Sequence, residues 1–227
     1  MTKVPTETER AGQLNYGVTT LGEAGTALAC AEKTYVVLGV SRGGTSAIAG
    51  VLNHLGVPMG PTGEAPLFED LPMNRALRGD ASALDAVIAD RNMKNPTWGF
   101  KGNAITQPFE EVACKLRNPI FVVIFRDLLA IANRAKISAD RDVASILLRQ
   151  SAEYQRILDF VVAGKYYSVM ISYEKLCMYP REVIELLLEK AGLTGQESQV
   201  MGAVEFIRPA PEDYLVVSRA NNAKSGK

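Results

Sequence analysis

Residues 35–46 read Tyr-Val-Val-Leu-Gly-Val-Ser-Arg-Gly-Gly-Thr-Ser, an apolar run that passes into a glycine-rich loop and then into the first residues of a helix. An apolar run without a polar face is typical of a strand that is covered on both faces of a parallel sheet. A helix that begins after Gly44 points unpaired backbone N–H groups and the positive end of its dipole at the loop. The stretch therefore predicts a strand, loop and helix that bind an anion such as phosphate or sulfate, although the same unit also forms without binding one.

The two glycines that frame this loop have the spacing of a nucleotide-binding motif. Gly39 and Gly44 match the Walker A frame G-x-x-x-x-G-K-[ST], but Thr45 stands where that motif has its lysine. This lysine contacts the outer phosphates of a nucleoside triphosphate, so its absence argues against nucleotide hydrolysis. Arg42, inside the loop, is the nearest substitute charge.

Composition limits the partners that the chain is expected to bind. The 227 residues suffice for one well-filled domain, and 25 basic residues balance 25 acidic residues. A chain without net positive charge does not generally attract DNA, RNA or an anionic membrane, so we expect a local anion pocket and no nucleic-acid partner. Three widely spaced cysteines, Cys30, Cys114 and Cys177, suit neither a disulfide framework nor a zinc site, and we expect no metal.

The two ends of the chain differ from its middle. Residues 1–33 are polar and dotted with glycine, and residues 218–227 are too polar to bury a core. We therefore expect a polar N-terminal extension, one α/β domain over residues 34–217, and a C-terminal tail. The first ten residues lack the apolar stretch of a signal peptide, and no apolar run reaches the roughly 20 residues of a membrane span. These features favour a cytoplasmic protein without a membrane span.

Strand-like and helix-like segments alternate within the expected domain. Apolar runs predict strands at residues 35–38, 98–101, 120–125 and 167–171. Amphipathic spacing predicts helices between Gly44 and Gly56, from about Ala139 to Ala163, and from Pro180 to Gly192. The alternation favours an α/β fold of three layers, with a mostly parallel sheet between helices, similar to the P-loop nucleoside triphosphatases.

A second candidate for anion binding follows the third predicted strand. Arg126 comes directly after the run Ile120–Phe125, and the carboxyl ends of parallel strands meet at one edge of a sheet. Its planar guanidinium suits a second phosphate at that edge. In the alternative interpretation, Arg126 pairs with Asp127 or another surface carboxylate. Asp127 is a poor candidate for a Walker B carboxylate, because the arginine at the end of the strand repels a magnesium ion.

With these residues assembled, the chain resembles the sulfotransferase family, which uses 3′-phosphoadenosine 5′-phosphosulfate (PAPS). Residues 39–46 are similar to the family's 5′-phosphosulfate loop, and residues 121–127 resemble the strand and R-D-P opening of its 3′-phosphate motif. Further similar segments are Ser172–Leu176, with Pro180 and the end of the following helix at Ala191-Gly192-Leu193; Phe68-Glu69-Asp70 with Asn74; and Trp98–Lys101. Together these segments span residues 35–193.

The resemblance implies a donor and the residues that bind it. PAPS would be held by Ser41, Arg42, Gly43, Gly44, Thr45 and Ser46 around its 5′ end, by Arg126 and Arg134 at its 3′-phosphate, and by Tyr173 near the adenine. The chain also departs from the family pattern. Leu128 replaces the proline after R-D, Arg134 stands where many members have a serine, and Asn103 stands where animal cytosolic members have a histidine as base.

Sulfuryl transfer needs cations at the donor and a base for the proton of the acceptor. The catalytic residues that we expect are Arg42 and Lys101 as cations and Glu69 as the base. In the alternative interpretation, Glu69 is a surface carboxylate that caps a helix beginning near Leu71. His54, the single histidine, is a lesser alternative as the base because it lies late on the first helix.

Three functions follow from these patterns. The first is a sulfotransferase that moves a sulfuryl group from PAPS to a hydroxyl or amine of a small-molecule, saccharide or lipid-like acceptor. The second is a P-loop kinase or nucleotide hydrolase, against which the missing lysine argues. The third is a non-catalytic relative that binds a nucleotide, which the missing histidine and the altered 3′-phosphate motif leave open.

Overall fold

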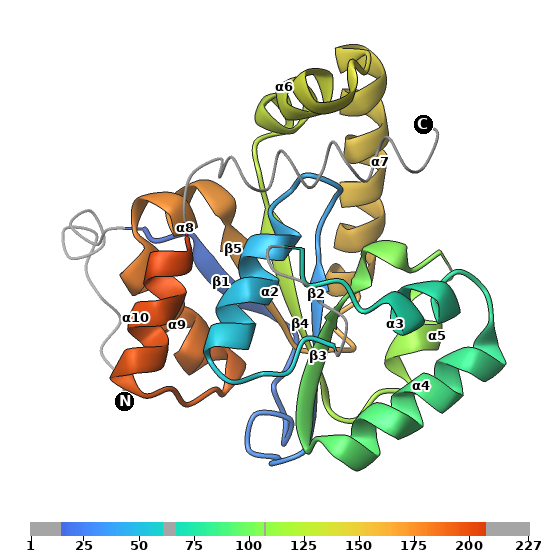
Figure 1. Cartoon of the computed structure of the whole chain (residues 1–227), viewed down its shortest axis with the longest axis vertical. Coiled ribbons are helices and arrows are strands. Elements are labelled where there is room, and N and C mark those ends of the chain that lie inside the picture. Colours follow the sequence, from blue (N-terminus) through green and yellow to red (C-terminus); the bar gives the residue numbers. More distant parts are fainter. Residues whose placement is uncertain (1–14, 61–66, 107, 208–227) are drawn as a thin grey trace.

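The computed structural model describes residues 15–60, 67–106 and 108–207 of the chain. In this part of the chain, a five-stranded sheet lies between two groups of helices (Figure 1). The predicted α/β class, with three layers and a mostly parallel sheet, is confirmed.

The strand predicted from residues 35–38 lies inside the sheet, between two parallel neighbours. Its strands are β1 (Val18–Leu21), β2 (Lys33–Leu38), β3 (Thr97–Lys101), β4 (Pro119–Phe125) and β5 (Ser168–Ser172). Their order is β1-β5-β4-β2-β3; β1 pairs antiparallel with β5, and the other pairs are parallel. Every residue of β2 is buried, as the apolar run in the sequence predicts.

Helices cover both faces of the sheet. One face carries α2 (Thr45–His54), α8 (Tyr173–Met178), α9 (Pro180–Ala191) and α10 (Glu197–Phe206). The other carries α3 (Leu71–Ala76), α4 (Ala81–Lys94), α5 (Phe109–Ala113), α6 (Leu128–Ala139) and α7 (Val143–Val162), and a short 3₁₀ helix, η1 (Gly102–Ala104), follows β3. Within the described ranges, no helix has both the length and the apolar character needed to cross a membrane.

The chain leaves the two central strands toward opposite faces of the sheet. Tyr35 and Val37 of β2 pack into the core on the α2 side, whereas Val36 and Leu38 pack into the core that contains α6 and α7. After β2 the chain enters α2, and after β4 it enters α6 on the other face. Such a divergence leaves a crevice beyond the carboxyl ends of the strands, where α/β proteins bind their ligands.

Two elements differ from the sequence prediction. β1 lies inside the segment predicted to be a polar extension, because a short edge strand of sequence Val-Thr-Thr-Leu needs no long apolar run. The helix predicted from about residue 139 begins instead at Val143, since Asp140 has a left-handed φ of 45° and Asp142 caps the new helix. Residues 208–217 of the predicted domain and the predicted tail lie outside the described residues.

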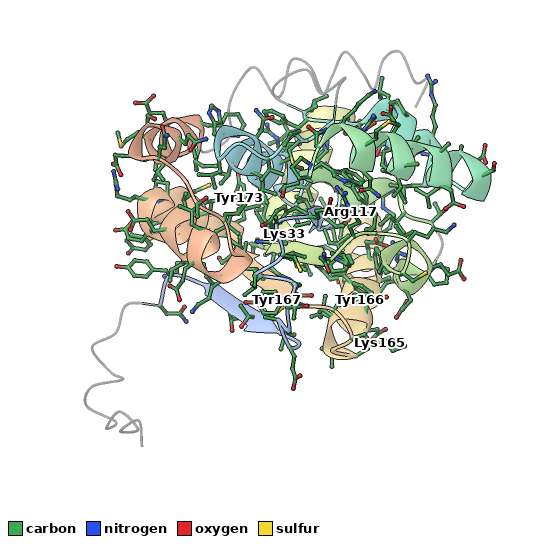
Figure 2. All side chains as sticks on the ribbon, turned by 90° about the horizontal axis from the view of Figure 1, so that it is seen from below. Lys33, Arg117, Lys165, Tyr166, Tyr167 and Tyr173 are labelled. Atoms are coloured by element: carbon green, nitrogen blue, oxygen red, sulfur yellow. The ribbon has the colours of Figure 1, made fainter. Side chains whose placement is uncertain are left out.

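Three side chains close the C-terminal end of α9, where the last carbonyls lack partners inside the helix. The carbonyls of residues 190, 191 and 192 accept hydrogen bonds from Tyr167 Oη (2.9 Å), Tyr35 Oη (2.8 Å) and Lys33 Nζ (2.9 Å), respectively. Lys33 and Tyr167 are labelled in Figure 2. Burial lowers the pKa of Lys33 and raises that of Tyr35. These bonds join α9 to the amino end of the sheet, opposite the crevice.

Candidate functional site

The loop that follows β2 has a backbone shape that requires glycine. Arg42 and Gly44 both have positive φ, of 67° and 98°. A Cβ atom on Gly44 would lie 2.4 Å from Tyr173 Cδ2, far inside normal contact distance. The hydrogen atom of glycine therefore lets the loop pass against the tyrosine ring, and it keeps the backbone accessible for close approach by a ligand.

The loop ends at the amino end of α2. Gly44 precedes the first turn of this helix, and no side chain among the described residues caps it. The first backbone N–H groups of a helix have no partner within it, and the helix dipole adds positive potential there. The structure thus contains the strand, loop and helix that the sequence predicts, and this end of α2 suits an anion.

Arg126, directly after β4, lies against this loop. Its Nη1 donates a hydrogen bond to the carbonyl oxygen of Arg42 (3.0 Å), and its guanidinium lies 4.4 Å from the centre of the Tyr173 ring. Its Nε is buried and has no hydrogen-bond partner among the described residues. A buried donor without a partner is costly, so the Nε edge of the guanidinium is poised for an acceptor from outside the chain.

Asp127 does not pair with this arginine. Its Oδ1 accepts a hydrogen bond from Ala130 N (2.7 Å) and caps α6. No salt bridge joins Arg126 to a carboxylate within the described part of the chain. The alternative interpretation of Arg126 as one half of a surface ion pair therefore finds no support in the contacts.

Tyr173 lies against the guanidinium of Arg126, and Arg134 adds a further positive charge near the tyrosine hydroxyl. Burial raises the pKa of the Tyr173 hydroxyl to about 12, whereas the positive charges of Arg126 and Arg134 act in the opposite direction. Arg134 is half-buried on α6, and its charge reaches the Tyr173 hydroxyl. The ring of Tyr173 is enclosed by Gly44 and the Arg126 guanidinium, so it forms part of the wall behind the loop.

Lys101, the last residue of β3, supplies a cation on the other side of the loop. Its Nζ lies 3.2 Å from Ser46 Oγ and 3.2 Å from Glu69 Oε1, and the residue is 3% exposed. Next to this contact, Asn103 Nδ2 donates to Thr45 Oγ1 (3.0 Å). Thr45 therefore does not take over the role of the Walker A lysine; the neighbouring strand brings an ammonium group to the first turn of α2.

Glu69 lies in the segment before α3, and it does not cap that helix. Asp70 does so instead, because its Oδ1 accepts a hydrogen bond from Met73 N (3.1 Å). The Glu69 side chain is 43% exposed, and its second oxygen lies 3.4 Å from Asn74 Nδ2. A carboxylate that is both exposed and close to the Lys101 ammonium can accept a proton from a ligand in the crevice.

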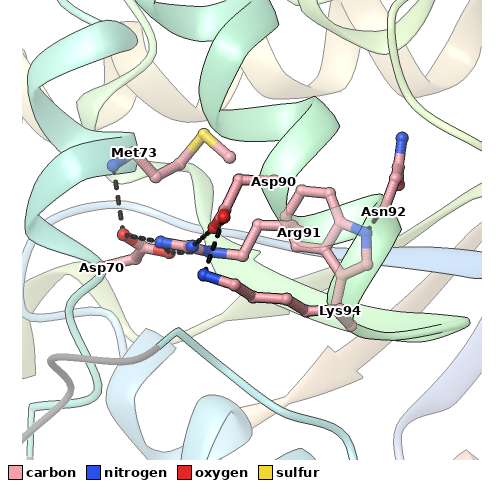
Figure 3. Close-up of polar contacts among 7 residues, drawn as sticks. Asp70, Met73, Asp90, Arg91, Asn92 and Lys94 are labelled. Carbon is pink, nitrogen blue, oxygen red and sulfur yellow. Dashed lines mark hydrogen bonds and ion pairs between the residues drawn. The ribbon is translucent and has the colours of Figure 1, made fainter.

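A buried ion pair anchors the residue next to Glu69 (Figure 3). Arg91 of α4 donates to both oxygens of Asp70, with distances of 2.9–3.1 Å, and the side chains are 9% and 1% exposed. Phe68, on the other side of Glu69, has a left-handed φ of 50°. The backbone that carries Glu69 is therefore held from both sides, and its side chain is left facing Lys101.

Three further candidate residues lie in different surroundings. Ser41 is exposed in the loop and Gly43 is buried in it, with Gly43 N donating to Val40 O (2.8 Å). His54 lies eight residues after Ser46 on the same helix, which is about 12 Å along its axis, and its ring packs near Phe206. The histidine is thus remote from the crevice and is not supported as a base.

Sequence reasoning did not identify the roles of several residues that shape the site. Tyr154 and Glu174 accept hydrogen bonds from the backbone N–H groups of residues 126 and 127. Tyr154 occurs in the apolar stripe of a predicted helix, so helical spacing marks it only as core. The capping role of Asp70 could have been predicted from the sequence, since an aspartate followed closely by a proline is typical of a helix start.

Comparisons with known proteins add the following. None of the family models matches the chain, and none of the curated proteins does. Among solved structures, the chain is similar to the crystal structure of a sulfotransferase from Alicyclobacillus acidocaldarius, with 13% sequence identity and a TM-score of 0.46, over 83% of this chain and 91% of that chain. At this level of similarity, the function has to be argued from the residues of the chain itself.

Gly44→Ala tests the shape of the loop. We expect the substitution to lose about 1–2 kcal/mol of stability from its left-handed backbone, and more because the methyl group displaces the Tyr173 ring. Anion binding should weaken as well. Urea unfolding and titration with pyrophosphate measure both effects. Gly25→Ala is the control, since Gly25 also has a positive φ but nothing lies within 4 Å of its added Cβ; equal losses in both variants would contradict the contact with Tyr173.

Arg91→Met tests the anchor beside Glu69. Removing the cation leaves the Asp70 carboxylate buried without a charged partner, so we expect a loss of about 3–5 kcal/mol in the free energy of unfolding. Lys94→Met is the control on the same helix, because its ion pair with Asp90 is exposed, and its effect should be much smaller. Similar stability of the two variants in urea would show that the buried pair contributes little.

Proposed function

We propose that the chain is a sulfotransferase that moves a sulfuryl group from PAPS to a hydroxyl or amine of an acceptor. The observation that carries this proposal is the contact between Lys101 Nζ and Ser46 Oγ, at 3.2 Å. Ser46 stands where the Walker A motif has the serine or threonine that binds Mg²⁺. Here a buried ammonium group occupies the neighbourhood of that hydroxyl, and its positive charge repels a divalent cation.

Lys101 therefore favours a donor whose negative charge is neutralised by groups of the protein and not by a bound Mg²⁺ ion. A sulfuryl group carries less negative charge than a phosphoryl group, so its transfer requires fewer cations. One lysine, the N–H groups of α2 and Arg42 suffice for such a donor in principle. A kinase or nucleotide hydrolase normally relies on the P-loop lysine and a metal ion, and the lysine is absent from this loop.

The other side of the loop fits a donor with a second phosphate. Arg126 Nη1 donates a hydrogen bond to the carbonyl oxygen of Arg42 in the loop, and the buried Nε has no hydrogen-bond partner among the described residues. Nε and Nη2 form one edge of the guanidinium, which binds a phosphate through two parallel hydrogen bonds. Arg134 adds a second positive charge near Tyr173. These residues suit the 3′-phosphate of PAPS, while the loop suits its 5′-phosphosulfate.

The chemistry assigns distinct roles to three groups of the chain. When bound, the donor supplies an activated sulfuryl group, with adenosine 3′,5′-bisphosphate as the leaving group. Glu69 accepts the proton of the acceptor hydroxyl or amine while the new bond to sulfur forms. Lys101 and the N–H groups of α2 stabilise the charge on the phosphate oxygen as its bond to sulfur breaks. The acceptor that we propose is a small-molecule, saccharide or lipid-like compound.

Nucleotide binding separates the proposal from the kinase alternative. Calorimetric titration should show that adenosine 3′,5′-bisphosphate binds without metal, and more tightly than ATP with or without Mg²⁺. The reason is that Arg126 and the loop lie ready for two separate phosphates, whereas the loop lysine for a triphosphate is missing. Tighter binding of ATP in the presence of Mg²⁺ would contradict the proposal and favour a kinase or hydrolase.

Glu69→Gln separates a transferase from a non-catalytic nucleotide-binding protein. With labelled PAPS and a library of hydroxyl and amine acceptors, we expect the wild type to transfer label and the variant to be about 100-fold slower, because the amide cannot take the proton. The bisphosphate affinity should stay within about twofold, since Glu69 lies on the acceptor side. Glu111→Gln, exposed on α5, is the matched control. Equal rates of label transfer by the two variants would show that Glu69 is not the base.

A further inference from the structure

The turn between β4 and α6 is fixed by side chains from two other helices. Arg126 N donates to Tyr154 Oη of α7 (2.8 Å), and Asp127 N donates to Glu174 Oε1 of α8 (3.0 Å). The Asp127 carboxylate then begins α6 by capping it. Consecutive N–H groups that leave the sheet thus receive partners from opposite faces of the fold.

Tyr154 is bound closely to the backbone of Arg126. Its hydroxyl accepts from Arg126 N and also lies 3.4 Å from Arg126 O, to which it donates. Its ring stacks on Phe125, with ring centres 5.2 Å apart and planes 22° apart, and the residue is 8% exposed. The ring of Tyr154 therefore holds Phe125, the last residue of β4, and its hydroxyl holds the backbone of Arg126, the residue after it.

The Arg126 side chain has little freedom to compensate for a shift of its backbone. Nη1 is held by the loop carbonyl of Arg42, and the guanidinium rests on the Tyr173 ring. Its Nε is buried and has no hydrogen-bond partner within the described part of the chain, so its direction is set by the position of the Cα atom and not by solvent. A bidentate contact with phosphate depends on that direction, because two parallel hydrogen bonds must form at once.

We infer that Tyr154 is a positioning residue that aims the Nε edge of Arg126, and that its hydroxyl thereby sets the preference of the site for a nucleotide with a second phosphate. The inference rests on the proposed function and adds to it a residue that determines donor selectivity. Tyr154 itself touches no substrate; it acts through Arg126. A tyrosine that serves only the core would instead affect stability and leave the selectivity between ligands unchanged.

The test compares two ligands and two isosteric variants. The dissociation constants of adenosine 3′,5′-bisphosphate and adenosine 5′-monophosphate are measured by calorimetry for the wild type, Tyr154→Phe and Tyr167→Phe. Tyr167 is a matched control, because it is also 8% exposed and its hydroxyl also donates to a backbone carbonyl, at the opposite edge of the sheet. Urea unfolding reports the stability of each variant.

For Tyr154→Phe we expect bisphosphate binding to weaken about five- to tenfold, while monophosphate binding stays within about twofold. Tyr167→Phe should leave both constants within about twofold despite a similar loss of stability. In an Arg126→Met background, the selectivity effect of Tyr154→Phe should disappear, because the group through which it acts is gone.

Each other outcome overturns the inference in an identifiable way. Equal weakening of both ligands by Tyr154→Phe, or no weakening, shows that the tyrosine is structural only, and leaves the proposed function intact. A selectivity effect that persists in the Arg126→Met background excludes action through that arginine. If the wild type binds the bisphosphate no more tightly than the monophosphate, the proposed function fails, and the inference fails with it.

Discussion

The ammonium group of Lys101 is the contact on which the candidate site depends most. It lies at the end of β3, almost fully buried, and bonds both the first turn of α2 through Ser46 and the segment before α3 through Glu69. A buried cation is tolerated only when acceptors surround it, so these three elements constrain one another. The positive charge that many phosphate-binding loops carry in their own sequence comes here from the adjacent strand.

The order of the strands explains why the loop has a cation on each side. β2 lies between β3 and β4, and all three run parallel, so their carboxyl ends meet at one edge. Lys101 ends β3 and Arg126 follows β4, which places an ammonium on one flank of the loop and a guanidinium on the other. The helices after β2 and β4 diverge to opposite faces, which is the arrangement in which α/β proteins bind ligands at the edge between them.

The sequence predicted this convergence because each element carries a local signal. The apolar runs mark β2 and β4, the glycines mark the loop, and the parallel order brings Arg126 to the same edge. The sequence did not predict β1, which is short and half polar, nor the role of Tyr154, because helical spacing identifies a core position without identifying what its hydroxyl contacts. It also left open whether Glu69 capped a helix, since only the contacts show that Asp70 does so.

The pairing of β1 with β5 has a consequence for how the chain is made. Val18 lies opposite Ile171, so two neighbouring strands of the finished sheet are separated by most of the chain. During translation at roughly 5–20 residues per second, β1 emerges on the order of ten seconds before its partner. β2, β3 and β4 are made in the meantime and pair with one another, and the antiparallel edge is completed only after β5 has emerged.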